Sequence, residues 1–546
     1  MNQITKTLSK ILFYSLIVFT ISIQGFAQQK KKPNVLFIAV DDLKPELGCF
    51  GNKMIKTPNI DKLAKRGCLF KQNYVQQAVC GPTRASIMTG MRPDYTRVWD
   101  LKTKMRDMNP DILSLPQYFI SQGYSTQGIG KIYDVRCVDK DLDKPSWSVP
   151  YYKVDKKYYD VNTGLPVLNY YQNPETKKQA EIYLKEAMDN GFNGEDAVTE
   201  ALKKLKPSIE CADVPDNAYI DGAHALEARD ILAQLSKKDE PFFFAVGFSK
   251  PHLPFVSPKK YWDLYKRDDM PLAPYQKPTE NAVDIAYHNS GEIRAYTDID
   301  PIVPLAKDSV GISLSVDKQK ELIHGYYAAV SYTDAQIGIV LKALDSLGLS
   351  DNTIIVLWGD HGWHLGDHNL WCKHTDFEQA THAPLIISAP WIKPSVVNAP
   401  TEFVDIFPTL CDLAKVKIPE HLDGKSLMPV MKNPLSVHKE YAVSQYPRSG
   451  PTAEKERLGY ANALYMGYSI RTKRYRYTMW LKDKFRTYDS FEESKIYGTE
   501  LYDYQTDPNE TRNVVKDKNY SKISVEMKNK MVAYFHNQEK KLKSGK

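Results

Sequence analysis

The chain has 546 residues, of which 42% are hydrophobic and 25% charged, and its formal net charge is +7. This length exceeds one ordinary hydrophobic core and predicts two domains, while 35 tyrosines and 8 tryptophans exclude a largely disordered chain. Much of the basic excess lies near the two ends, and no nucleic-acid-binding motif accompanies it, so no nucleic acid partner is expected. The positive net charge of the chain is compatible with a polyanionic substrate.

The first residues have the pattern of a secretory signal peptide. Two lysines precede an apolar run from Ile11 to Ile23, and Gly25 and Ala27 are small residues at the positions that define a cleavage site. We therefore assign residues 1–27 to a signal peptide and expect export of the mature protein to the periplasm or the exterior. The run is short for a membrane span, and no other segment resembles one.

Four apolar runs are predicted to be buried strands, and each ends at charged or imidazole side chains. The runs are Asn34–Val40, before Asp41 and Asp42; Gly123–Gly130, before Lys131; Pro241–Phe248, before Lys250 and His252; and Thr353–Gly359, before Asp360 and His361. Ligands of open α/β sheets bind beyond the carboxyl ends of the strands. These polar side chains are therefore expected to share one crevice.

Helical patterns between the strands predict a large α/β domain. The segments Thr57–Gly67 and Lys318–Gly348 are amphipathic, and their alternation with the strands indicates a central, mostly parallel sheet flanked by helices. We assign this domain to residues 28–435.

The pattern changes after residue 435. Residues 466–481 alternate polar and apolar side chains, as a half-buried antiparallel strand does, and Ser521–Lys541 has the pattern of an amphipathic helix. Residues 436–546 are therefore expected to form a smaller α+β domain with an antiparallel sheet.

The acidic residues at two strand ends favour a metal site. Adjacent Asp41 and Asp42 would repel each other strongly unless a cation lies between them. With Asp360 they supply hard oxygen ligands, which suit Ca²⁺ or Mg²⁺ better than zinc, and His361 offers a nitrogen. Each stretch alone is equally compatible with helix caps and turns. Four later histidines fit no zinc motif and are expected to be hydrogen-bonded loop or surface residues: His364, His368, His374 and His382.

Cys80 precedes a predicted helix that runs to Gly90, because Pro82 suits the first helical turn. A group at a helix N-terminus meets exposed N–H donors, which favour anionic ligands and chemistry. A thiolate beside three carboxylates would meet repulsion unless a metal intervened. From the residues alone, Cys80 is a nucleophile, a ligand or a small buried side chain, and the alternatives stay open.

Two signatures give the chain a family resemblance. Residues Ala78–Gly90, "AVCGPTRASIMTG", resemble the cysteine-type signature of the type I sulfatases, and Gly123–Tyr133 resembles the second signature. Stretches between about residues 33 and 510, among them "AVGFSKPHLPF", "DHGWHLGDH" and "MGYSIRT", are similar to the iduronate-2-sulfatase-like branch. The resemblance implies an alkaline-phosphatase-like fold for the large domain.

The resemblance also implies the cofactors and the site residues. In this family a maturation enzyme oxidises the motif cysteine to Cα-formylglycine, whose hydrated form is the nucleophile, and Ca²⁺ is the metal. The implied metal ligands are Asp41, Asp42, Asp360, His361 and residue 80. The implied catalytic residues are Cys80, Arg84, Lys131, His252 and Lys373, and those expected to contact substrate are Lys131, His252, Trp363 and Lys373.

The implied function is that of an exported, calcium-dependent sulfatase, acting from chain ends on 2-O-sulfate groups of an algal polysaccharide or glycosaminoglycan. Two alternatives stay open: a formylglycine phosphodiesterase or phosphonate hydrolase of the same superfold, and a catalytically impaired glycan-binding homologue. The chain departs from the family at two positions, which concern the catalytic base and the sugar. Asp134 replaces a histidine that is a candidate base, and Leu464–Tyr465 replace a basic residue suited to a uronate carboxylate, so a neutral 2-sulfated pentose is as plausible as iduronate.

Overall fold

The computed structural model describes residues 31–299, 314–448, 464–482 and 490–543. The predicted signal peptide lies outside the described residues. From Asn34 onwards the chain forms one compact unit. The predicted boundary at residue 435 stays a prediction.

A seven-stranded sheet forms the centre of the fold, with the order β12-β2-β11-β8-β1-β6-β4. Its strands are β1 (Asn34–Val40), β2 (Cys68–Phe70), β4 (Ser125–Gly130), β6 (Phe242–Phe248), β8 (Thr353–Gly359), β11 (Leu385–Ser388) and β12 (Ser395–Val397). The neighbours β8, β1, β6 and β4 are parallel, and β11 is antiparallel to both of its neighbours. The four predicted strands and the mostly parallel sheet are thereby confirmed.

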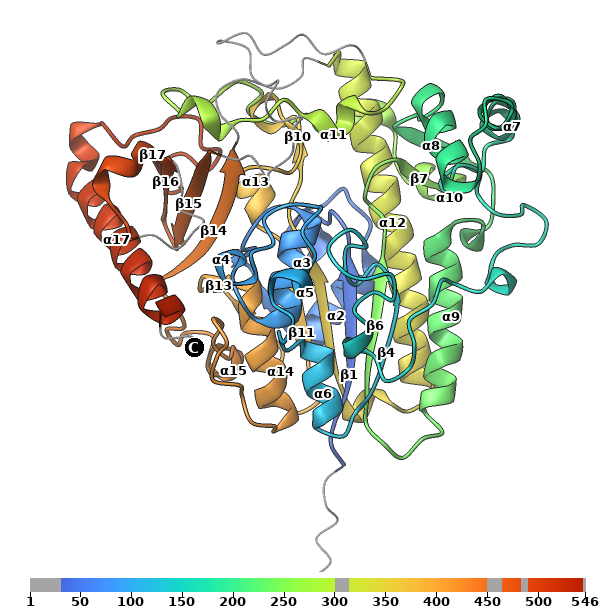
Figure 1. Ribbon diagram of the computed structural model, residues 1–546, viewed down its shortest axis with the longest axis horizontal. Helices are drawn as coiled ribbons and strands as arrows, with labels where there is room; N and C mark the ends of the chain where they lie inside the picture. The colour runs from blue at the N-terminus through green and yellow to red at the C-terminus, as the bar shows by residue number, and fades with distance from the viewer. Residues whose placement is uncertain (1–30, 300–313, 449–463, 483–489, 544–546) are drawn as a thin grey trace, which may run out of the picture. The chain divides into compact units, whose positions relative to one another are not determined.

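Helices cover both faces of this sheet because alternate side chains of each strand point to opposite faces. On one face, Leu36, Ile38 and Val40 of β1 share a core with three helices: α2 (Pro58–Arg66), α9 (Ile220–Leu235) and α12 (Val316–Ser346). On the other, Val35, Phe37 and Ala39 share a core with α3 (Cys80–Thr89), α6 (Leu115–Ser121) and α14 (Ile406–Ala414). Figure 1 shows these helices around the sheet. Burial on both faces explains why the strands read as continuous apolar runs.

The C-terminal part contains an antiparallel sheet of four strands, as predicted. They are β14 (Tyr441–Arg448), β15 (Tyr465–Thr472), β16 (Tyr475–Lys482) and β17 (Ile496–Asp503), and α17 (Ser521–Lys543) packs on them. The prediction of one strand over residues 466–481 was wrong, because the chain turns at Lys473 and Arg474. No glycine, proline or asparagine marks this turn; the Thr472 hydroxyl accepts hydrogen bonds from the backbone N–H of Arg474 and Tyr475 instead.

The described chain also contains further α-helices and short strands, together with 3-10 helices of three residues each. The remaining helices are α4 (Pro93–Thr96), α5 (Met105–Met108), α7 (Pro174–Asp189), α8 (Gly194–Lys204), α10 (Lys259–Trp262), α11 (Gly291–Arg294), α13 (Glu378–Thr381) and α15 (Met428–Lys432). The remaining strands are β3 (Asn73–Tyr74), β5 (Ile209–Ala212), β7 (Phe255–Pro258), β9 (His364–Leu365), β10 (Trp371–Cys372) and β13 (Thr401–Glu402).

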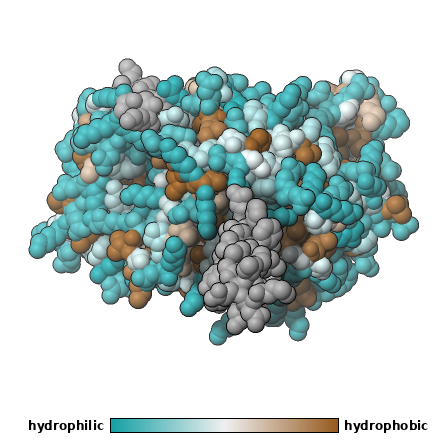
Figure 2. All heavy atoms as spheres, turned by 90° about the horizontal axis from the view of Figure 1, so that it is seen from below, coloured by the Kyte–Doolittle hydropathy of each residue, from teal (hydrophilic) through white to brown (hydrophobic). Residues whose placement is uncertain are grey.

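The surface drawn in Figure 2 is mainly hydrophilic, and its apolar side chains lie in small separate groups. This matches a chain in which a quarter of the residues are charged. Among the described residues, no helix is both long and apolar enough to cross a membrane.

Candidate active site

The carboxyl ends of β1, β4, β6 and β8 bring the predicted site residues together at one edge of the sheet. The residues that follow these strands are Asp41 and Asp42 after β1, Lys131 after β4, His252 in the loop after β6, and Asp360 and His361 after β8. Cys80, the first residue of α3, lies against them. The predicted convergence of these side chains at one edge of the sheet is therefore present in the fold.

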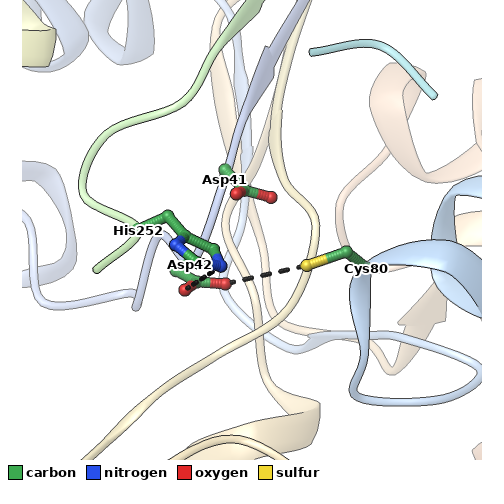
Figure 3. Close-up of side chains that lie close together, drawn as sticks. All are labelled: Asp41, Asp42, Cys80 and His252. Atoms are coloured by element: carbon green, nitrogen blue, oxygen red, sulfur yellow. Dashed lines mark hydrogen bonds and ion pairs between the residues drawn. The ribbon is translucent and has the colours of Figure 1, made fainter. Parts of the chain in front are cut away.

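Acidic, imidazole and thiol groups form a compact cluster there. In two overlapping groups, ligand atoms lie within 4.8 Å of one another: Asp41, Asp42, Cys80 and His252 in one, and Asp42, Cys80, Asp360 and His361 in the other. Figure 3 shows the Cys80 sulfur pointing from α3 toward Asp42, with His252 approaching Asp42 from another side. The Cys80 sulfur lies 3.4 Å from His361 Nε2. Carboxylate oxygens with one imidazole are a donor set suited to a hard divalent cation.

The electrostatics of Asp42 are those expected of a carboxylate that binds a cation. Burial and the neighbouring Asp41 carboxylate raise the pKa of Asp42 to about 7, although the Lys373 ammonium opposes them. For Asp41, burial also favours the neutral acid, but Lys131 and Arg84 hold its pKa well below the usual range. A cation between the two carboxylates would remove the repulsion that disfavours the charged form of Asp42.

Arg84 fixes two of these carboxylates from α3. Its Nη2 lies 2.9 Å from Asp41 Oδ1, its Nε lies 3.1 Å from Asp360 Oδ2, and all three side chains are fully buried. Its Nη1 donates to the carbonyl oxygens of Lys131 and Ile132, which ties the loop after β4 to α3. One guanidinium thus joins three segments of the site.

We expect Arg84→Ala to destabilise the metal-free protein by about 3–5 kcal/mol, because it leaves two buried carboxylates without their partner. The matched control is Arg66→Ala, whose half-exposed pair with Asp345 at 2.9 Å should change stability by less than about 1 kcal/mol. Denaturant unfolding of both variants in EDTA measures the difference. Equal stability of the two variants would contradict the structural role of Arg84.

Glu292, on the short helix α11, belongs to the site but was not predicted from the sequence. Its Oε1 lies 2.8 Å from Lys373 Nζ and 3.2 Å from His252 Nε2. Lys373 also lies 3.0 Å from Asp42 Oδ1. Glu292 therefore neutralises two groups expected to act on the substrate. No strand end or motif marks this residue in the sequence.

The prediction that Trp363 contacts substrate does not fit its position. Its side chain is fully buried, and Lys373 Nζ lies 4.7 Å from the centre of its ring. Trp363 therefore holds the Lys373 ammonium by a cation–π contact, and its own ring has no surface exposed to a ligand. His364 and His368 are buried and contact the hydroxyls of Thr375 and Thr279, in line with the expected hydrogen-bonded role.

The environment of Cys80 disfavours a thiolate. Its side chain is buried, and burial together with the Asp41 carboxylate raises the pKa of the thiol well above its usual value. None of the seven cysteines, all of which the structure describes, forms a disulfide. Of the three roles left open by the sequence, an unassisted thiolate nucleophile is therefore the least compatible with this site.

Comparisons with known proteins show which family the chain resembles. The family model "Sulfatase" matches residues 33–416, and "N-sulphoglucosamine sulphohydrolase, C-terminal" matches residues 366–537. The chain is 33% identical to iduronate 2-sulfatase of Homo sapiens, over 89% of this chain and 91% of the human protein. It is 31% identical to a sulfatase of Formosa agariphila, over 77% and 76% of the two chains.

Solved structures show the same fold. The phosphonate monoester hydrolase of Agrobacterium radiobacter superimposes with a TM-score of 0.65 at 24% identity, over 93% of this chain and 96% of that one. A 2-O GAG sulfatase superimposes with a TM-score of 0.61 at 22% identity, over 94% of each chain. At these identities the similarity establishes the fold alone.

Proposed function

The chain belongs to the sulfatase family, in its iduronate-2-sulfatase-like branch, and from this premise we propose its reaction and its substrate. Family membership makes the protein a sulfuric ester hydrolase. We propose that it is exported, uses Ca²⁺ and a formylglycine made from Cys80 by a maturation enzyme, and removes 2-O-sulfate groups from the ends of a sulfated glycan. The position of Cys80, whose sulfur lies within 4.8 Å of ligand atoms of Asp42, Asp360 and His361, carries this proposal.

The residues of the cluster fit the implied cofactors. Asp41, Asp42, Asp360 and His361, with residue 80, would hold the ion, and the raised pKa of Asp42 is the electrostatic cost that a cation offsets. When present, Ca²⁺ acts as a Lewis acid toward the sulfate group, and formylglycine supplies a hydrated aldehyde as the nucleophile. The buried, high-pKa thiol of Cys80 supports the view that sulfur itself is not the nucleophile.

The surrounding side chains are placed to handle the charge and the proton of the reaction. Lys131 and Lys373 put two ammonium groups beside the carboxylates, where they offset the negative charge of a sulfate ester. His252 binds the Leu253 carbonyl oxygen through Nδ1, so its Nε2 faces the cluster. His252 or Lys373 then protonates the leaving sugar oxygen.

The side from which the substrate approaches follows from exposure. The side chains of Lys131 and His252 retain 22% and 26% of their accessible surface, whereas Asp41 and Asp42 retain none. A sulfate ester therefore meets Lys131 and His252 first and reaches the carboxylate cluster behind them.

The glycan class is proposed from the relatives. One is named for iduronate 2-sulfate esters, and an ulvan-active sulfatase of Formosa agariphila is 26% identical over 86% of this chain and 78% of that protein. A 2-O-sulfated uronic acid or pentose at a chain end is compatible with both names.

Hydrolysis of two matched aryl esters tests the reaction. We expect the protein, expressed with a formylglycine-generating enzyme, to cleave 4-nitrophenyl sulfate at least about tenfold more efficiently than bis(4-nitrophenyl) phosphate, in kcat/KM. The reverse preference would favour a phosphodiesterase of the same fold. Binding of sulfated oligosaccharides without release of sulfate would favour an impaired homologue.

Mass spectrometry tests the maturation and the export. The peptide that contains residue 80 is expected to be about 18 Da lighter than its cysteine form, the difference between a thiol and an aldehyde side chain. Exported protein is expected to begin at Gln28. Active enzyme that carries unmodified Cys80 would contradict the proposed nucleophile.

A further inference from the structure

Asp134, which stands where the family signature has histidine, is held by Arg136 two residues later. Arg136 Nε donates to Oδ1 at 2.8 Å and Nη2 donates to Oδ2 at 2.7 Å, while the backbone N–H of Arg136 also donates to Oδ1 at 3.0 Å. Both carboxylate oxygens are therefore engaged by one planar fork, the arrangement that orients a guanidinium best.

This pairing makes Asp134 a weak base. Although burial favours the neutral acid, the hydrogen bonds from Arg136 and the charge of Lys131 lower the pKa of Asp134 to about 2. A group with this pKa accepts a proton poorly near neutral pH. Asp134 thus does not take over the proton-accepting role considered for the histidine.

The loop that carries the pair is fixed against α3 at both ends. At its start, Arg84 donates to the carbonyl oxygens of Lys131 and Ile132. At its end, the sulfur of Cys137 lies so close to Gly81 that any side chain at Gly81 would overlap it. Because Gly81 directly follows Cys80, the loop between these anchors runs beside the residue proposed to carry the nucleophile.

Within this loop the two charges of the pair differ in exposure. The Asp134 side chain is 2% exposed, whereas that of Arg136 is 50% exposed. The Asp134 carboxylate, which accepts these hydrogen bonds, raises the pKa of Arg136. Nε and Nη2 of Arg136 make these hydrogen bonds, and among the described residues Nη1 makes none, so both of its N–H groups can donate to a ligand.

The other positions considered for a second basic group are neutral. Leu464 is half-exposed, and the ring of Tyr465 packs at 4.8 Å on that of Tyr497. Arg136 therefore offers a fixed, outward-facing cation on a loop beside the carboxylate cluster. Its charge is additional to the two ammonium groups assigned to the scissile sulfate.

We propose that the Asp134–Arg136 pair recognises a second anionic group of the substrate, a carboxylate or a further sulfate, on the sugar that carries the scissile ester or on its neighbour. The inference rests on the proposed sulfatase function. Arg136 contacts the anion, and Asp134 is a positioning residue that fixes the plane of the guanidinium. Arginine suits this task because its planar donors match carboxylate and sulfate oxygens.

Four sulfate esters test the proposal in one experiment. They are 4-nitrophenyl sulfate, methyl 2-O-sulfo-glucoside, methyl 2-O-sulfo-glucuronoside and methyl 2,6-di-O-sulfo-glucoside, so that the last two add one anion of each kind to the neutral sugar. We expect wild-type kcat/KM to favour an anion-bearing sugar. Arg136→Ala should raise KM for that sugar about 10- to 100-fold and change hydrolysis of 4-nitrophenyl sulfate less than about threefold. If Arg136→Ala lowers kcat/KM mainly for the glucuronoside, the recognised anion is a carboxylate. If it lowers kcat/KM mainly for the 2,6-disulfate, the anion is a second sulfate.

Variants of the pair separate recognition from structure. Asp134→Asn should raise KM for the anion-bearing sugar with little change in kcat, and Arg136→Lys should retain part of the preference because it keeps the charge without the fork. Arg229→Ala, which removes an exposed arginine paired to its neighbour Asp230, is the matched control and should leave all four rates unchanged. Thermal melting checks that each variant is folded.

Three outcomes would overturn the inference. They are a wild-type enzyme that cleaves 4-nitrophenyl sulfate without preferring any anion-bearing sugar, an Arg136→Ala enzyme that keeps the wild-type preference, and an Asp134→His enzyme that gains kcat on 4-nitrophenyl sulfate. The last result would mean that a histidine at position 134 acts as a base and that this chain has lost that base. Failure of wild-type protein to cleave any of the four esters would instead overturn the proposed function.

Discussion

Replacing Cys80 with alanine or serine is expected to abolish turnover, with kcat lowered at least about 10⁴-fold. Cys80 begins α3 at the centre of the ligand cluster, and no other cysteine lies in that cluster. Alanine removes every nucleophile at this position. Serine keeps a hydroxyl, but without conversion to an aldehyde it cannot give the proposed nucleophile. Sulfate release from 4-nitrophenyl sulfate measures both variants.

The matched control for this experiment is Cys211→Ser. Cys211 is exposed on β5 and is not part of the cluster, so its replacement should leave kcat within about twofold of wild type. Melting temperatures of all three variants report whether the Cys80 variants are folded. A folded Cys80→Ser enzyme with wild-type turnover would refute the assignment of residue 80.

The strands and the main site residues could be predicted because the physics behind them is local. β1 and β8 begin and end where the sequence predicted, since buried parallel strands require continuous apolar runs. Polar residues directly after such runs had to meet at one edge of the sheet. The convergence of Asp41, Asp42, Asp360 and His361 followed from these two facts.

The roles of other site residues depend on contacts between distant parts of the chain, which no local sequence pattern indicates. Glu292 reaches the site from a four-residue helix, and its charge matters only because Lys373 and His252 fold against it. Trp363 looked available for substrate, yet Lys373 covers its ring. The sequence identifies Asp134 only as the replacement of a histidine, and its ion pair with Arg136 is seen in the folded loop. In each case burial and pairing, which the sequence does not encode locally, decide what the side chain does.

Removing one proposed metal ligand is expected to abolish activity and metal binding together. In Asp360→Asn, the amide keeps the shape of the side chain but loses the charge that the ion requires, so we expect kcat to fall at least about 10³-fold. In wild-type protein, Ca²⁺ at about 100 times its Kd should stabilise the fold by about 2.7 kcal/mol, seen as a rise in melting temperature over EDTA-treated protein. Asp360→Asn should lose most of this rise.

The loss of the calcium-dependent rise separates a metal ligand from a merely structural aspartate. Asp360 also accepts hydrogen bonds from the backbone N–H of Asp42 and from Arg84, so a lower melting temperature in EDTA alone would report only those contacts. The matched control is Asp345→Asn, on the surface in a pair with Arg66, which should keep both activity and the calcium response. If Asp360→Asn retains its calcium-dependent stabilisation and bound calcium by elemental analysis, Asp360 is no ligand, and the cluster at the end of β1 and β8 must hold its charges by Arg84, Lys131 and Lys373 alone.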